Sequence, residues 1–120
     1  MTKSDATRAS TALGDEHCIP LKGAEHALSP IEIEGLLGEI DSWTLADDRR
    51  AISREFKFAD FHRCMAFVNA VAFIAHQEDH HPDMEVGYSR CQLRYSTHDV
   101  GGLSRNDFIS AARVDRLQAT

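Results

Sequence analysis

The 120-residue sequence has no apolar run approaching the roughly 20 residues that a membrane-spanning helix needs. Its N-terminal stretch also lacks the apolar core of a signal peptide, so we expect a cytoplasmic protein. Basic residues are few, since 13 Lys and Arg against 19 Asp and Glu give a net charge of −6. Because binding to a nucleic-acid backbone needs a basic face, we expect neither a membrane nor a nucleic-acid partner.

Cysteine is scarce as well, and its spacing excludes common structural uses. Cys18, Cys64 and Cys91 are odd in number and form no CxxC pair, which disfavours a disulfide framework or a thiolate metal site. Cys64 and Cys91 fall in apolar periodic stretches, so we predict that they are buried as small hydrophobic side chains. Gly101-Gly102 lacks the lysine and the spacing of a phosphate-binding loop.

The length and the 42% hydrophobic content suit one domain with one core. Residues 1–28 show no sustained periodicity and are predicted to be a loosely ordered arm. Residues 29–120 are predicted to form a single domain. A chain of this size leaves room for a site in a surface cleft, or in a groove that another subunit completes.

Hydrophobic periodicity and capping signals predict an ordered series of elements. A helix over 30–40 starts after Ser29, which with Glu32 forms a capping box. Strands are expected over 43–45 and 51–58, a long helix over 61–78 capped by Asp60, a second hairpin over 86–88 and 91–97, and a last helix after a capping box at 104–107. This order predicts an α+β domain with helices on one face of an antiparallel sheet. The apolar stripe of the long helix is broad enough to suggest a further contact with a neighbouring subunit.

Seven histidines are many for this length, and three of them crowd the end of the long helix. His76, His80 and His81 lie there, and His98 ends a strand. The pair His76 and His80, at i and i+4, permits a metal site, but the glutamate is not where a zinc protease HExxH motif has it. A solvated helix end is the second interpretation. General acid/base catalysis is the third, because histidine exchanges protons near neutral pH. Asp107 has two interpretations of its own: a helix cap or a functional carboxylate.

The motifs Asp79-His80-His81-Pro82 and Ser96-Thr97-His98-Asp99, followed by Gly101-Gly102-Leu103-Ser104 and Asn106-Asp107-Phe108, resemble those of pterin-4a-carbinolamine dehydratases. The resemblance covers about residues 29–117. It implies a four-stranded antiparallel sheet with helices on one side, a homodimer or homotetramer, and no metal or organic cofactor. It also implies dehydration of 4a-hydroxytetrahydropterin to quinonoid dihydropterin, the step that recycles the pterin of aromatic amino-acid hydroxylases.

By this resemblance, His80 and His98 are the expected acid/base pair and His81 positions the pterin, while Asp107 is an active-site carboxylate. His76 stands where many members carry a glutamate. An acidic contact to the pterin is therefore missing, or is replaced by Glu78 or Asp79, and His76 stays a candidate substrate-binding residue. The family also includes coactivators that bind a transcription factor's helices, so a protein-binding role of the long helix is the alternative function.

Overall fold

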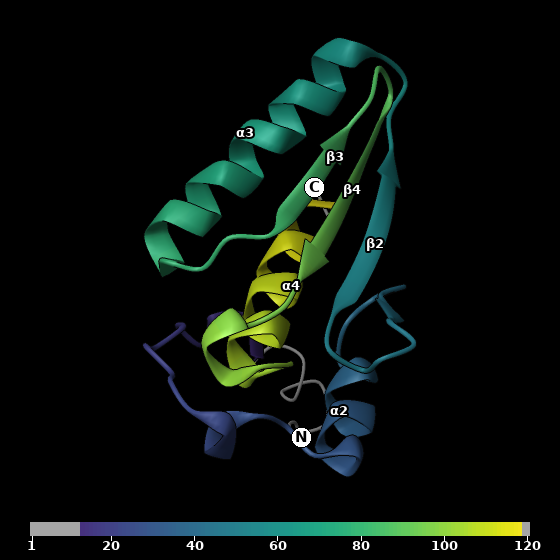
Figure 1. Cartoon of the computed structure of the whole chain (residues 1–120). Coiled ribbons are helices and arrows are strands. Elements are labelled where there is room, and N and C mark those ends of the chain that lie inside the picture. Colours follow the sequence, from purple (N-terminus) through teal and green to yellow (C-terminus); the bar gives the residue numbers. More distant parts are fainter. Residues whose placement is uncertain (1–12, 119–120) are drawn as a thin grey trace, which may run out of the picture.

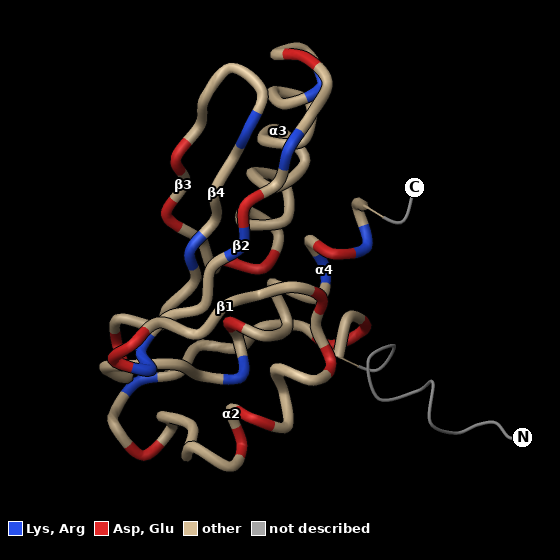
Figure 2. The backbone as a smooth tube through the Cα atoms, turned by 90° about the vertical axis from the view of Figure 1, so that its right-hand side faces the viewer, with Lys and Arg blue, Asp and Glu red and all other residues tan. Residues whose placement is uncertain are grey.

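The computed structural model describes residues 13–118. Its elements follow the order η1 (Ala24–His26), α2 (Pro30–Leu37), β1 (Thr44–Leu45), β2 (Ile52–Lys57), α3 (Phe61–Glu78), β3 (Asp83–Val86), β4 (Arg90–Tyr95), η2 (His98–Val100) and α4 (Arg105–Gln118) (Figure 1). The four strands form one antiparallel sheet in the order β1-β2-β4-β3. The predicted α+β class is confirmed, with α3 and α4 lying on the same side of the sheet (Figure 2).

Local capping explains where the first two main helices begin. The Ser29 hydroxyl accepts the Glu32 N–H at 3.2 Å and the Glu32 carboxylate accepts the Ser29 N–H at 2.8 Å, so the predicted capping box is confirmed. Asp60 accepts the Arg63 N–H at 2.8 Å and begins α3. Asp79 ends α3 in the left-handed region, with φ 53°. These caps fix α3 at its predicted bounds, whereas α2 ends three residues earlier than expected.

The core lies between the sheet and the helices. Alternate residues of β4 point into it, and Cys91, Leu93 and Tyr95 are fully buried. Cys64 on α3 is equally buried, so the burial predicted for Cys64 and Cys91 is confirmed. The opposite face of the sheet carries exposed charged side chains of both signs, including the ion pairs Glu55–Arg90 and Asp83–Arg94. Only one face of this sheet is therefore apolar, as expected of an antiparallel sheet with helices on one side.

Arg54 breaks the alternation of β2, and the structure supplies the reason. Its Nη1 donates to Asp115 Oδ1 on α4 at 2.8 Å, and its guanidinium lies 4.4 Å from the centre of the Phe56 ring. Asp115 also accepts the Trp43 indole N–H at 2.8 Å. The carboxylate thus joins β2 and the segment before β1 to α4. An inward-facing arginine is tolerated here because its charge is paired.

The second hairpin differs from its prediction at the first strand. β3 covers Asp83–Val86, earlier in the sequence than the strand expected over 86–88. It is an edge strand that pairs only with β4, and three of its four residues are exposed. Because most of its residues are exposed, β3 shows no apolar alternation from which a strand could be predicted. Gly87 donates its N–H to Arg90 O at 2.8 Å and belongs to the turn instead.

Candidate active site

A hydrogen-bonded pair, His80 and Asp107, lies at the centre of the candidate site. His80 follows the C-cap of α3, and Asp107 lies in the first turn of α4. The Asp107 carboxylate is fully buried, and its Oδ1 lies 2.7 Å from His80 Nε2. Its Oδ2 accepts the Thr97 hydroxyl at 2.7 Å and the Ser104 N–H at 3.0 Å. A carboxylate that already accepts two donors acts as an acceptor toward the third, so His80 Nε2–H donates to it. This bond leaves His80 Nδ1 as the ring nitrogen available for proton exchange.

Asp107 contacts both the residue that precedes α4 and His80. It is the third residue of α4, and it accepts the N–H of Ser104, the residue preceding the helix. That contact is one half of the predicted capping box. The Ser104 hydroxyl does not complete the box, because it bonds the Thr97 hydroxyl at 2.7 Å instead. The same carboxylate therefore caps α4 and orients His80.

The ring of Tyr95 supports His80 from the core side. The two rings are stacked, with centroids 5.9 Å apart and planes 10° from parallel. Burial raises the pKa of the Tyr95 hydroxyl, and nearby Cys18 and Asp107 add to the rise. This hydroxyl has no hydrogen-bond partner within residues 13–118. Tyr95 thus acts on His80 through its ring, and it was identifiable from sequence only as an inward position of β4.

A pocket of about 310 Å³ opens beside this pair. The domain side of its wall carries carboxylates, an imidazole and small polar groups: Glu78, Asp79, His80, Thr97, Asp99 and Asn106. The N-terminal arm contributes a run of five consecutive residues, 18–22, of which Ile19, Pro20 and Leu21 are apolar and Lys22 is charged. A pocket lined by both apolar and hydrogen-bonding groups suits a small molecule with flat faces and polar edges.

The predicted site residues are distributed unevenly around this pocket. His80 lines it, with its side chain 13% exposed, and so does Asp79, while Asp107 lies directly behind His80. His81, His98 and His76 are exposed, and they are not among the described residues that line the pocket. In the part of the chain that the structure describes, no group of three or more His, Cys, Asp or Glu side chains could hold a metal ion.

Glu78 and Asp79, the two candidates for the missing acidic contact, have different environments. The Glu78 carboxylate is 1% exposed; its Oε1 accepts the Cys18 N–H at 2.8 Å and its Oε2 lies 2.9 Å from His17 Nδ1. Burial opposes its charge, but these bonds and the nearby Arg113 guanidinium outweigh burial and lower the pKa of Glu78. Glu78 is thus occupied by the protein's own donors, whereas Asp79 is exposed and lines the pocket.

The fold and the pocket define an α+β protein in which a His–Asp pair lies beside a small pocket. The family model of pterin 4 alpha carbinolamine dehydratase matches residues 26–117, and the chain belongs to this family. A protein of Xanthomonas campestris pv. campestris strain 8004, named as a pterin-4-alpha-carbinolamine dehydratase, is 55% identical over 105 residues, 88% of this chain and 89% of the relative. A relative from Xanthomonas axonopodis pv. citri strain 306 with the same name is 53% identical over equal shares.

Solved structures agree with this assignment. A transcriptional coactivator/pterin dehydratase from Brucella melitensis superposes with a TM-score of 0.73 at 32% identity, over 76% of this chain and 97% of that chain. A pterin dehydratase-like RuBisCO assembly factor of the alpha-carboxysome shares the fold, with a TM-score of 0.58 at 22% identity. Within residues 13–118, no helix is long and apolar enough to span a bilayer.

Proposed function

We propose that this protein is a hydro-lyase that removes water from 4a-hydroxytetrahydropterin and releases quinonoid dihydropterin. The observation that carries the proposal is the His80–Asp107 pair beside a pocket, in a chain that belongs to the pterin 4 alpha carbinolamine dehydratase family. The protein-binding alternative is not favoured, since curated relatives that are 55% and 53% identical to this chain are named for the enzyme. A cytoplasmic location and a role in recycling the pterin of aromatic amino-acid hydroxylases belong to the same proposal.

The reaction needs two proton movements and no oxidant. The C4a–O bond breaks as an acid protonates the leaving hydroxyl, and a base takes the proton of a ring nitrogen while a carbon–nitrogen double bond forms at C4a. His80, held by Asp107 with Nδ1 free, can make one of these transfers. We propose His98 for the other, with His81, Asp79, Asp107 and His76 as substrate-binding candidates.

The proposed roles of His98 and His81 can be separated by steady-state kinetics. We expect the wild-type protein to accelerate quinonoid dihydropterin formation, followed by absorbance. His98→Ala should lower kcat by about 10²-fold or more, because a proton-transfer group is lost. His81→Ala should mainly raise KM, because a positioning contact is lost.

His62→Ala is the matched control, since His62 is an exposed histidine at the far end of α3. Full activity in both the His98 and the His81 variants would remove these two residues from the site.

A homo-oligomer is part of the proposal, and the outer face of α3 is the surface that favours it. Phe73 lies there and is 65% exposed, on the helix whose broad apolar stripe suggested a contact with a neighbouring subunit. Phe73→Ser should therefore shift the protein toward smaller species in sedimentation velocity. Ile31→Ser is the control, because Ile31 on α2 is 85% exposed outside this surface. An unchanged sedimentation profile of the Phe73 variant would exclude this face.

A further inference from the structure

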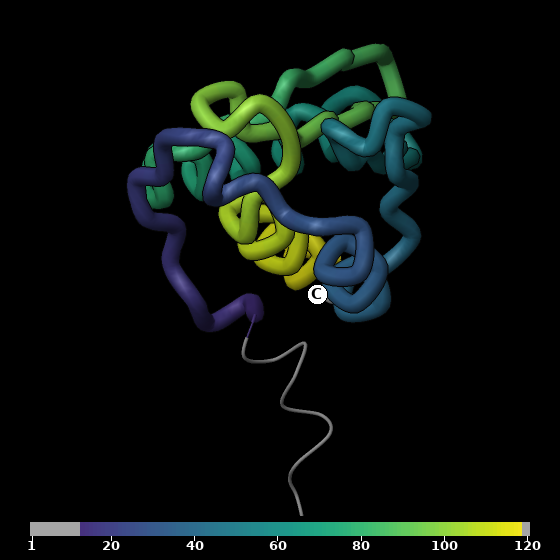
Figure 3. Tube along the Cα trace, turned by 60° about the horizontal axis from the view of Figure 1, so that its bottom comes forward, coloured from purple at the N-terminus to yellow at the C-terminus, as the bar shows by residue number. Residues whose placement is uncertain are grey.

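The N-terminal segment of residues 16–22, which we call the strap, forms one side of the pocket. Figure 3 shows it, in purple and blue, running along the end of α3 and past η2 before α2 begins. The strap residues 18–22 line the pocket together with His80 and Asp79. Three of them, Ile19, Pro20 and Leu21, are apolar. This wall could not be predicted from the sequence, because the strap has no hydrophobic periodicity of its own.

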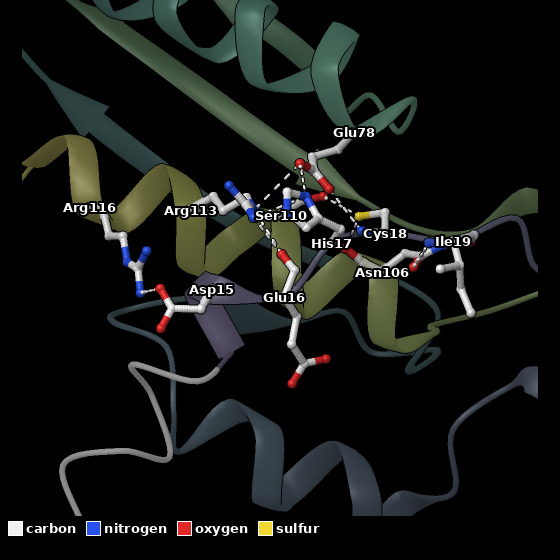
Figure 4. A network of polar contacts seen from close by, with 10 residues as sticks. All are labelled: Asp15, Glu16, His17, Cys18, Ile19, Glu78, Asn106, Ser110, Arg113 and Arg116. Atoms are coloured by element: carbon white, nitrogen blue, oxygen red, sulfur yellow. Dashed lines mark hydrogen bonds and ion pairs between the residues drawn. The ribbon is translucent and has the colours of Figure 1, made fainter.

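Asn106 holds the middle of the strap by both polar groups of its side chain. Its Oδ1 accepts the Ile19 N–H at 3.2 Å, and its Nδ2 donates to Ile19 O at 2.7 Å (Figure 4). The side-chain amide therefore pairs with the strap backbone as a neighbouring strand would. Asn106 directly precedes Asp107, so this anchor and the partner of His80 belong to the same turn of α4.

Glu78 and Arg113 hold the start of the strap. The buried Glu78 carboxylate accepts the Cys18 N–H at 2.8 Å, and Arg113 donates to Glu16 O through Nε at 3.0 Å and Nη2 at 2.6 Å (Figure 4). Glu78 lies two residues before His80 on the same chain segment. At the far end, Gly23 donates its N–H to Asp99 O at 3.0 Å, beside His98. The Glu78 contact thus holds the chain close to His80, and the Asp99 contact holds it close to His98.

The strap lies outside the part of the chain that the family model matches, which begins at residue 26. The alignment with the Xanthomonas campestris relative covers 105 residues of this chain. Residues 26–120 are too few to hold an alignment of 105 residues, so that alignment also includes residues before position 26. The strap therefore precedes the region that the family model matches, and it contributes to the pocket.

We propose that the strap forms a binding wall for the substrate, with Ile19 and Leu21 packing against the flat bicyclic ring. The inference rests on the proposed function, which supplies the ring. A pterin has apolar faces and polar edges, and the strap brings Ile19, Pro20 and Leu21 to a pocket that Lys22 and Asp79 also line. Ile19 is 61% exposed, so its side chain has apolar surface that a ring would cover.

Truncating the wall tests this inference. Ile19→Ala and Leu21→Ala should each raise KM by about 10-fold, with kcat nearly unchanged, because the removed atoms contact the ring equally before and during reaction. The Kd for 7,8-dihydrobiopterin, which carries no 4a-hydroxyl to lose, should rise by the same factor in isothermal titration calorimetry. Ile31→Ala is the matched control and should leave both constants unchanged, since Ile31 is exposed on α2 and lines no part of this pocket.

The possible outcomes separate the wall from the function. An active wild type whose KM and Kd are unaltered by both strap substitutions would overturn the wall and leave the dehydratase standing. A wild type that neither dehydrates the carbinolamine nor binds 7,8-dihydrobiopterin would overturn both. Weakened binding in the strap variants, with the Ile31 variant unaffected, would support the wall through a readout that does not depend on turnover.

Discussion

His80→Ala should lower the kcat of carbinolamine dehydration by about 10²–10⁴-fold, the usual contribution of a single general acid or base. His80 lines the pocket, its Nε2–H is bound to the buried Asp107, and its ring is stacked on Tyr95. The imidazole is thus held in one orientation, with Nδ1 as the nitrogen left for proton exchange. Initial rates of quinonoid dihydropterin formation give the measurement, with substrate at saturating concentration.

The matched control for this substitution is again His62→Ala, which removes an exposed histidine from the other end of the same helix. It should retain wild-type kcat. Because His80 is mostly buried, circular dichroism and thermal unfolding must show that the His80 variant is folded at the assay temperature. A folded His80→Ala protein with wild-type kcat would refute the proposed role of this residue.

The helix α3 shows what local sequence signals can predict. The bounds of α3 were predicted from its apolar stripe, from the N-cap Asp60 and from Pro82, which follows the end of the helix. All three signals act within a few residues. The edge strand β3 was misplaced because its burial pattern has no apolar alternation, and its strand conformation comes from pairing with β4. Short-range chemistry thus determined the helices, whereas a long-range partner determined β3.

The site was predictable to a similar extent. The resemblance drew attention to His80 and Asp107, and the capping signal placed Asp107 in the first turn of α4. Their contact spans 27 positions in the sequence, so spacing alone could not reveal it. The position of the strap could not be predicted for the same reason. Asn106 and Ile19 are 87 positions apart in the sequence, and their contact joins a side-chain amide to a backbone carbonyl. Contacts of this kind leave no periodic pattern.

Asp107→Ala should lower the free energy of unfolding by about 3–5 kcal/mol, because it removes a buried carboxylate that accepts three hydrogen bonds, and each buried donor left without a partner costs about 1–3 kcal/mol. The carboxylate is 0% exposed and accepts bonds from His80, Thr97 and Ser104. Its loss leaves buried donors without an acceptor, and it also removes the cap of α4. Urea unfolding of the wild type and the variant, followed by circular dichroism, measures the difference.

Asp83→Ala is the matched control, because that carboxylate is 85% exposed and lies 3.8 Å from Arg94 in a surface ion pair. Such a pair contributes about 0–1 kcal/mol, so the control should unfold near the wild-type midpoint. Asp107→Asn should fall between the two. The amide keeps the size of the side chain, but it turns one acceptor into a donor facing either His80 or the Thr97 hydroxyl. Equal stability of the Asp107→Ala and Asp83→Ala proteins would mean that the buried carboxylate does not hold the site together.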